Sequence, residues 1–533
     1  MIARNEGKHN LQIIFIVIGI FFCAFLIFPM AYIFLKAILS DTGISLEFYK
    51  DIIDRKNFLK IFANSVSVAA LSGCITTVLA FIIAYTMNYT NISNKMKKYI
   101  RLLVMLPMLL PTITYGFAII YSFGKQGLIT LIFGKQLFEI YGLNGLLIGY
   151  VIYTLPISFL LINNTMGYID KKFSIVSKAM GDSVLRTFFS TIMLPLVGTL
   201  TASFIQSFTL SFTDYGIPAS VGGNVELMST LLYNEMLGSM PNFNTGSVVA
   251  VLMMIPSVVS FAVLSYISKY NIRYTKISTI ELSRNKLRDW ICGILSATIL
   301  ILELAIFVVI FIVPFVIQWP YKVSFTLQHF MAIIGDKSLM RVYGNSLLIS
   351  IITAFFGTLI VYGAGLISAR KILSYKYEKV LDGISILANT IPGMVLGVAY
   401  LMAFKGTFIQ NTFFIIIVCN IVHFFSSPYI MMKSGLEKLN ASWETTAKLM
   451  GDSWLKTIVR IITPNSRGTI LEVFRYFFIN SMVTVSAVIF IAGARTMVIT
   501  AKIKELQHFS NFNEIFVLSI LILLTNLIVK KEI

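Results

Sequence analysis

About twelve mostly apolar segments, each near 20 residues or longer, recur along this sequence. An α-helix needs about 20 such residues to cross the hydrocarbon core of a bilayer, so each segment is a candidate span. Only 13% of the residues are charged, against about 25% in an average soluble domain. We therefore predict an all-α polytopic membrane protein with spans near 12–36, 62–86, 101–123, 144–163, 192–219, 247–268, 290–317, 342–368, 381–404, 411–432, 468–494 and 513–529.

The basic residues predict how these spans are oriented. If the N-terminus lies inside, 28 of the 43 Lys and Arg residues fall in cytoplasmic intervals, and the interval 221–246 outside has none. Cytoplasmic loops of membrane proteins carry this excess of positive charge. We expect a multi-pass protein of the plasma or inner membrane with both termini in the cytoplasm. The net charge of +19 then reflects the flanks of membrane helices and anionic lipid, not nucleic acid.

A polar motif interrupts the apolar pattern twice, and its glycines, Gly181 and Gly451, lie 270 residues apart. Gly ends a helix readily in the left-handed conformation, and Asp or Ser caps the helix that follows. We predict two short helices joined by a tight turn in each copy, lying along the cytoplasmic face. Such helices could press on lipid, but a symmetric partner that binds both copies explains why the same residues recur. The motif residues are Lys178, Gly181, Asp182, Ser183 and Pro195, and then Lys448, Gly451, Asp452, Ser453 and Pro464.

The duplication extends well beyond this motif. Asn64-Ser65 and Asn345-Ser346 lie 281 residues apart, as do Pro111 and Pro392. An even number of spans in each repeat makes the two repeats parallel, related by an axis along the membrane normal. We predict a first six-helix unit at 1–268 with its core at about 60–268, a basic cytoplasmic linker at 269–289, and a second unit at 290–533 with its core at about 341–529.

The repeated motif resembles the cytoplasmic EAA loop of ABC importer permeases. The second copy matches at Glu444, Ala447, Gly451 and Pro464, and the first at Gly181, Ile192, Leu194 and Pro195, with Ser177 in place of the second Ala and no Glu. The resemblance implies the type I importer transmembrane fold. It also implies that a separate ATPase dimer, which holds ATP and Mg, binds both loops, and that an extracytoplasmic binding protein delivers the substrate.

Within that family the chain is similar to the fused permeases of the ferric iron, 2-aminoethylphosphonate and polyamine group. The similarity is carried by the segment 211–218, by Gly222-Gly223, and by the corresponding segment 481–487. The expected substrate is ferric iron, and 2-aminoethylphosphonate, a polyamine or thiamine are alternatives.

Polar residues within the fifth and eleventh spans are candidates for lining the path. A polar group in the bilayer is costly, so it usually faces a cavity or a partner group. Interhelical hydrogen bonding by Ser and Thr is the alternative explanation. The candidates are Gln206, Ser207, Ser211, Thr213, Asp214, Asn480, Ser481, Thr484 and Ser486.

Two other function classes are compatible with many spans. An ion-coupled secondary transporter is often built from parallel six-helix repeats, but few charged residues lie within the spans to couple ions. A membrane enzyme would need a catalytic constellation, and the sequence contains neither a phosphate-binding glycine loop nor metal-ligand spacing among its cysteines and histidines. We predict a transport subunit with no catalytic, cofactor-binding or metal-binding residues of its own.

Overall fold

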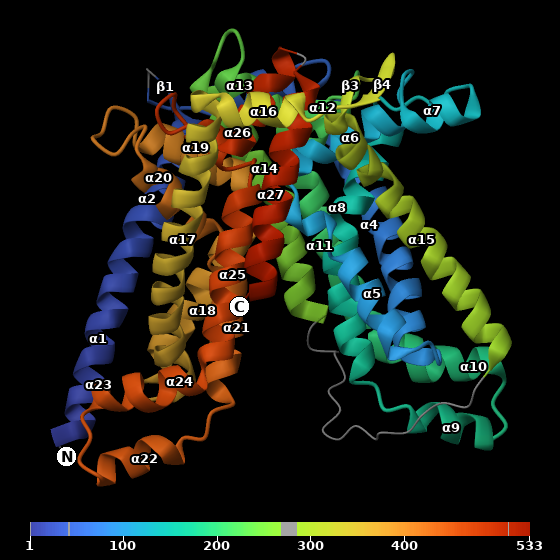
Figure 1. Cartoon of the computed structure of the whole chain (residues 1–533). Coiled ribbons are helices and arrows are strands. Elements are labelled where there is room, and N and C mark those ends of the chain that lie inside the picture. The colour runs from blue at the N-terminus through green and yellow to red at the C-terminus, as the bar shows by residue number, and fades with distance from the viewer. Residues whose placement is uncertain (1, 41–42, 268–284, 510, 533) are drawn as a thin grey trace.

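The computed structural model describes residues 2–40, 43–267, 285–509 and 511–532, which form a helical bundle whose long helices run between two ends (Figure 1). The helices of the first repeat are α1 (Ile2–Phe22), α2 (Phe28–Ile38), α3 (Glu47–Ile53), α4 (Phe58–Tyr89), α5 (Asn94–Val104), α6 (Thr112–Phe123), α7 (Leu128–Phe133), α8 (Leu143–Gly167), α9 (Lys172–Ala179), α10 (Val184–Phe188), α11 (Leu194–Thr213), α12 (Gly216–Val221), α13 (Met228–Leu237) and α14 (Phe243–Ile267).

The second repeat continues the same order of elements. Its helices are α15 (Lys286–Ile312), α16 (Gln328–Gly335), α17 (Lys337–Arg370), α18 (Tyr375–Thr390), α19 (Gly393–Ala403), α20 (Phe413–His423), α21 (Ser426–Glu437), α22 (Ser442–Leu449), α23 (Trp454–Thr457), α24 (Thr463–Asn465), α25 (Arg467–Val483), α26 (Ile499–His508) and α27 (Phe512–Glu532). Two small antiparallel hairpins pair β1 (Leu39–Ser40) with β2 (Gly43–Ile44), and β3 (Val316–Gln318) with β4 (Lys322–Phe325). The predicted linker 269–289 lies largely outside the described residues.

The predicted all-α membrane fold is confirmed, but the number of spans differs from twelve. Within the described ranges, nine helices are long and apolar enough to cross a membrane, or eleven if each of two bent helix pairs is one span. The expected spans 101–123 and 381–404 are both broken where a proline, Pro111 or Pro392, precedes the next helix. Proline has no N–H to donate and disfavours helix in the residue before it, so the continuous helices were wrong at these points. The pair α18 and α19 bends by 98° there.

The two other departures lie later in the second repeat. The expected span 411–432 bends by 58° between α20 and α21. The expected span 468–494 contains only the 17-residue helix α25, because the backbone becomes extended at Thr484. Serine and threonine dilute the apolar pattern in this segment, and the helix stops among them.

Each repeat contributes its first helix to the core of the other repeat (Figure 1). The α1–α2 segment packs on the second repeat, where Tyr400 Oη donates a hydrogen bond to the carbonyl oxygen of Phe25 over 2.6 Å. In the reverse direction, α15 packs on α4 of the first repeat, where Ser296 Oγ donates to Thr86 Oγ1 over 2.7 Å. The two repeats are therefore interlocked along most of their length.

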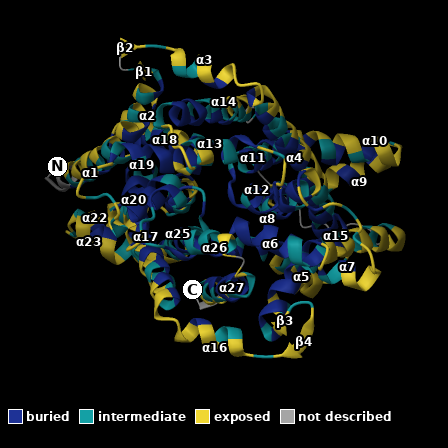
Figure 2. Cartoon of the chain, turned by 90° about the horizontal axis from the view of Figure 1, so that it is seen from above, coloured by how far each residue is buried: buried dark blue, intermediate teal, exposed yellow. Residues whose placement is uncertain are grey.

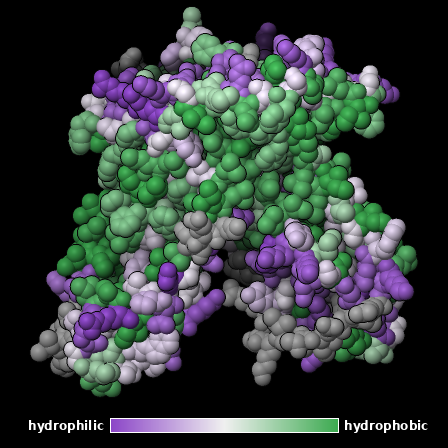
Figure 3. Space-filling model, in the orientation of Figure 1, coloured by the Kyte–Doolittle hydropathy of each residue, from purple (hydrophilic) through white to green (hydrophobic). Residues whose placement is uncertain are grey.

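The surface divides into an apolar band and polar ends. Figure 3 shows hydrophobic residues around the middle of the bundle and hydrophilic residues concentrated toward both ends. Large apolar side chains such as Val17, Ile20 and Leu359 are exposed on the long helices, whereas Figure 2 shows the central helices mostly buried. Contiguous exposed apolar surface of this size fits a lipid environment.

The repeated Asn-Ser pairs hold equivalent helices at the end opposite the N-terminus. Ser65 Oγ accepts a hydrogen bond from the backbone N–H of Met228 over 2.7 Å, at the start of α13. Ser346 Oγ accepts one from the backbone N–H of Ile499 over 2.8 Å, at the start of α26. The two contacts use residues 281 and 271 apart in the sequence, so α13 and α26 are repeat counterparts. Both serines satisfy backbone donors that a helix start leaves free.

Replacing Ser65 or Ser346 with alanine is expected to destabilise the protein by about 1 to 3 kcal/mol in each case, because a buried backbone N–H loses its acceptor. Thermal unfolding of each purified variant measures the change. Ser67, which is exposed on the same helix as Ser65, gives the control variant Ser67→Ala. Equal midpoints for Ser65→Ala and Ser67→Ala would contradict this account of the repeated pair.

Candidate functional site

The two copies of the repeated motif form the same structure at one end of the bundle. We call α9 and α10 with the turn between them the first elbow, and α22 and α23 with their turn the second elbow. Both elbows lie at the end where the N-terminus is marked, away from α13, α26 and the hairpins (Figure 1). A five-residue π-helical segment follows each one, at Phe189–Met193 and at Ile458–Ile462. Such segments are rare and often occur at functional sites.

The turn in each elbow depends on its glycine. Gly181 has a φ angle of +85° and Gly451 one of +82°, which is the left-handed region predicted for both. The next backbone N–H, of Asp182 or Asp452, reaches back to a carbonyl oxygen five residues earlier, over 3.1 and 3.0 Å. These bonds satisfy carbonyls at a helix C-terminus that would otherwise lack a donor.

Serine is the residue that caps the second helix of each elbow. Ser183 Oγ accepts from the backbone N–H of Arg186, and Ser453 Oγ accepts from that of Lys456, over 3.3 and 3.4 Å. The aspartate before each serine forms an ion pair instead. Asp182 pairs with Arg186, and Asp452 pairs with Lys456. Both exposed pairs add little stability on their own, but they fix the same charge arrangement twice.

The elbows present exposed apolar side chains around these turns. Met180 and Met450 occupy matching positions before the glycines, and 78% and 79% of their surfaces are exposed. Val184 and Leu185 in the first elbow and Leu449 and Leu455 in the second are also exposed. Lys178 and Lys448 flank this surface and are exposed too. Pro195 and Pro464 lie in the first turn of the helices that follow.

The inner sides of the two elbows are held differently. In the second elbow, Glu444 Oε1 lies 2.8 Å from Nε of Arg370, whose side chain is only 4% exposed. Burial raises the pKa of Glu444, and the guanidinium of Arg370 opposes that rise. Ala447 is buried beside this pair.

The first elbow has neutral groups at the equivalent places. Ser174 stands at the position of Glu444, and its Oγ lies 2.8 Å from Thr191 Oγ1. Ser177 stands at the position of Ala447, and its Oγ donates to Asp182 Oδ2 over 2.7 Å. The shared fold of the two elbows is therefore supported by an ion pair on one side and by hydroxyl groups on the other.

The N-terminal helix contacts only the second of the two turns through a tryptophan. Gly7 lies against the ring of Trp454 so closely that a Cβ at Gly7 would approach its Cδ1 to 2.7 Å. Val184 occupies the equivalent position in the first elbow and is exposed. The sequence alone did not predict this contact, because Gly7 and Trp454 are separated by almost the whole chain.

Several of the predicted path residues bond to neighbours within their own repeat. Ser207 Oγ lies 2.7 Å from Ser158 Oγ, and Ser72 Oγ donates to Ser211 Oγ over 3.0 Å. These hydroxyls are buried and follow the alternative that the sequence left open.

The remaining candidates divide between local bonds and partly open positions. Thr213 Oγ1 donates to the carbonyl oxygen of Thr209 over 2.8 Å. Asn480 donates to the carbonyl oxygen of Tyr476 over 2.7 Å, and Ser481 Oγ accepts from Asn420 over 2.8 Å. Gln206, Thr484 and Ser486 are half-buried.

Asp214 has a structural role in this arrangement. Its carboxylate accepts hydrogen bonds from Thr112 Oγ1 over 2.8 Å and from the backbone N–H of Ile217 over 2.9 Å. The second bond caps the start of α12, which is a common task for aspartate. Both oxygens of this buried carboxylate thus have donors within the first repeat.

A cluster that the sequence did not predict joins the two repeats at the end opposite the elbows. Tyr215 is 2% exposed, its ring stacks on that of Tyr233 with centroids 4.6 Å apart, and Lys504 Nζ lies 5.8 Å from its centroid. Gln507 accepts a hydrogen bond from Lys504 over 2.9 Å and donates one to the carbonyl oxygen of Ala219 over 3.0 Å. Burial lowers the pKa of Lys504 to about 8. We call Tyr215, Tyr233, Lys504 and Gln507 the outer cluster.

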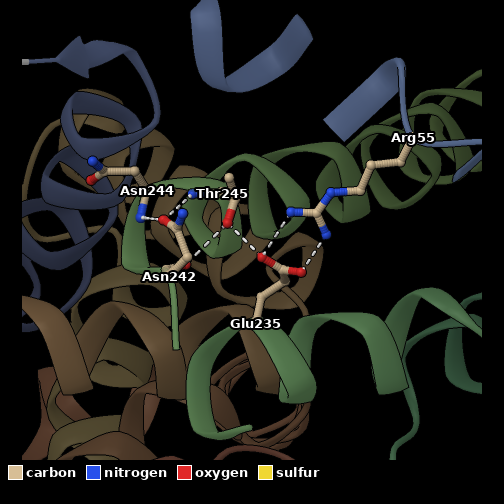
Figure 4. Close-up of polar contacts among 5 residues, drawn as sticks. All are labelled: Arg55, Glu235, Asn242, Asn244 and Thr245. Atoms are coloured by element: carbon tan, nitrogen blue, oxygen red, sulfur yellow. Dashed lines mark hydrogen bonds and ion pairs between the residues drawn. The ribbon is translucent and has the colours of Figure 1, made fainter. Parts of the chain in front are cut away.

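The helix that carries Tyr233 is anchored separately on its other side. Figure 4 shows Arg55, which follows α3, directed at the carboxylate of Glu235 on α13. Thr245 of α14 donates a hydrogen bond to the same carboxylate. Asn242 accepts from the backbone N–H groups of Asn244 and Thr245 over 3.1 and 3.2 Å. These contacts tie α13 to α14 and to the loop after α3.

Comparison with known proteins places the chain in a family. The family model described as "binding-protein-dependent transport system inner membrane component" matches residues 76–274 and 361–530, which is one match in each repeat and more than half of the chain.

Individual relatives agree with the family match. The putative ferric transport system permease of Haemophilus influenzae is 26% identical over 504 residues, covering 91% of this chain and 78% of that protein. The ferric transport system permease of Actinobacillus pleuropneumoniae is 26% identical over 508 residues, covering 92% and 72%. A probable sulfate transport system permease of Helicosporidium is 27% identical over 180 residues, covering 33% of this chain and 66% of that protein.

Proposed function

The chain belongs to the family of binding-protein-dependent transport system inner membrane components, and from this premise we propose that it forms the translocation path of an ATP-driven importer for ferric iron. It is a multi-pass inner-membrane permease of the ABC importer class, with two transmembrane domains fused in one chain. This membership sets aside the ion-coupled secondary transporter and the membrane enzyme as interpretations of the sequence.

The substrate proposal is supported by the relatives that align along almost the whole chain. Both are named as ferric transport permeases, and each covers more than 90% of this sequence. The relatives named for other substrates, including sulfate, align over about a third of it. Ferric iron is therefore favoured over 2-aminoethylphosphonate, a polyamine or thiamine.

The coupling proposal depends on the paired elbows. Each presents a left-handed glycine turn with an exposed methionine just before it, and the two turns lie at the same end of the bundle. A pair of identical surfaces is suited to a pair of identical partners. We propose that one subunit of a separate ATPase homodimer binds each elbow on the cytoplasmic face, so that both termini are cytoplasmic.

The remaining parts of the proposal follow from that orientation. The end that carries α13, α26 and the hairpins then faces outward, where a substrate-binding protein delivers the cargo. ATP and Mg belong to the partner ATPase. The two sequence repeats serve as the two transmembrane domains, with cores at about 60–268 and 341–529.

The observation that carries this proposal is the duplicated elbow, and co-purification with the ATPase tests it. We expect the ATPase expressed with this chain to remain bound through affinity purification in detergent and to hydrolyse ATP faster with the chain than without it. As a control, the chain carrying both Met180→Asp and Met450→Asp should retain much less ATPase, because a buried unpaired carboxylate disfavours an apolar contact. Equal retention of ATPase by both forms would contradict docking at the elbows.

A further inference from the structure

The structure holds a donor-rich cluster between the repeats that the proposed importer mechanism does not yet use. We propose that the outer cluster receives the cargo at the outer mouth and selects cargo that carries an oxyanion, such as a carboxylate, phosphate or phosphonate group. This inference rests on the proposed function as an importer, and it narrows the substrate class to species with a net negative charge.

The position of the outer cluster supports this role. Tyr215 belongs to the first repeat, whereas Lys504 and Gln507 belong to the second, so the cluster spans the boundary between them. Viewed from above, α12 and α26 lie near the centre of the molecule (Figure 2). A path that runs along the axis between the repeats would pass this point.

The duplication places two different side chains on the same ring. Tyr233 lies five residues after Met228 and Lys504 five residues after Ile499, the residues that the repeated serines hold. The two counterparts therefore approach Tyr215 from helices related by the repeat. A tyrosine and a lysine at equivalent positions give the mouth a positive charge on one side only.

The chemistry of the cluster favours an anion. Lys504 is largely withdrawn from water, and its ammonium group contacts an amide oxygen and an aromatic face, with no carboxylate partner among the described residues. The neighbouring Glu505 forms an ion pair with Lys502, and Asp214 is occupied by two donors of its own. A cation in such a place gains strongly from an oxyanion, since hydrogen bonds between ionised groups are the strongest of their kind.

Opening of the mouth would make these donors available. In this structure the four side chains contact one another or the carbonyl oxygen of Ala219. Separation of α12 from α26 would break the bond from Gln507 and uncover the ammonium group, the two phenolic hydroxyls and the amide N–H. Ferric iron would then enter as a complex with an anionic chelator, because a bare trivalent cation is repelled by Lys504.

The test measures uptake by cells that express the chain with its ATPase and binding protein. Radioactive iron is supplied at limiting concentration as ferric citrate, a complex of net negative charge. Lys504→Gln is expected to lower uptake about tenfold, because one charged hydrogen bond to the cargo is lost. Lys504→Arg, which keeps the charge, should stay within about twofold of the wild type.

Two further variants separate cargo recognition from folding. Lys502→Gln removes a positive charge from the same helix but outside the cluster, and it should take up iron within about twofold of the wild type because its charge is already paired. Tyr233→Phe keeps the stacked ring and removes one hydroxyl donor, so a smaller decrease is expected. The amount of each variant in the membrane is measured in parallel.

The outcomes distinguish the two proposals. If the wild type imports iron and Lys504→Gln imports it as well as Lys502→Gln does, the oxyanion site is refuted while the iron importer stands. If the wild type imports no iron, ferric iron is refuted as the substrate. Uptake of inorganic phosphate or 2-aminoethylphosphonate that Lys504→Gln loses and Lys504→Arg keeps would still support the site.

Discussion

Replacing both Gly181 and Gly451 with valine is expected to reduce ATP-driven uptake by more than tenfold while the protein still reaches the membrane. Both glycines have positive φ angles, and a residue with a Cβ atom in the left-handed conformation costs about 1 to 2 kcal/mol, more when it is β-branched. No atom surrounds either position closely enough to meet an added Cβ, so the strain is confined to the backbone of the turn. Relief of that strain would turn the exposed methionines away from their partner. Uptake and ATPase retention are measured together.

A matched control separates coupling from general strain. Gly134, which ends α7, has a φ angle of +69°, and an added Cβ there would also meet no atom within 4 Å. Gly134→Val therefore imposes a similar backbone strain far from the elbows, and its uptake should stay within about twofold of the wild type. Full uptake by the double elbow variant, or an equal loss in Gly134→Val, would contradict a coupling role for the two turns.

Much of the elbow was predictable from the sequence because its determinants are local. A glycine that ends one helix and a serine that caps the next act within a few residues, so the repeated letters predict the repeated turn. The same reasoning failed where single residues interrupt a long apolar segment. Pro111 and Pro392 appeared only as repeat markers, yet each one precedes a new helix and breaks the expected span.

The outer cluster could not be predicted in the same way. Tyr215 and Lys504 are 289 residues apart, and apolar periodicity does not tell which helices of a bundle are neighbours. One signal was available: Tyr233 and Lys504 follow the repeated serine contacts at equal spacing. The exchange of α1 and α15 between the repeats likewise depends on long-range packing that the order of helices along the chain does not reveal.

Glu444→Ala is expected to destabilise the protein by about 3 kcal/mol, whereas Ser174→Ala at the equivalent place should cost about 1 kcal/mol. The difference arises because loss of Glu444 leaves the guanidinium of Arg370 buried without its counter-charge, while loss of Ser174 removes one hydroxyl contact. Arg370 keeps a hydrogen bond of 3.1 Å to the carbonyl oxygen of Leu439, which places Glu444→Ala at the lower end of the range for a broken buried pair. Thermal unfolding of the purified chain with its ATPase measures both changes.

A second substitution at Arg370 tests whether the unpaired charge is the cause. In Arg370→Met the long apolar side chain fills much of the same volume without a charge, so adding it to Glu444→Ala should recover more than half of the lost stability. The recovery requires that the two residues act on each other, because independent sites would give additive losses. If the double variant is less stable than Glu444→Ala by the full cost of Arg370→Met alone, the ion pair does not hold the second elbow. The two elbows would then be equally sensitive to their inner contacts, despite the difference between carboxylate and hydroxyl at this position.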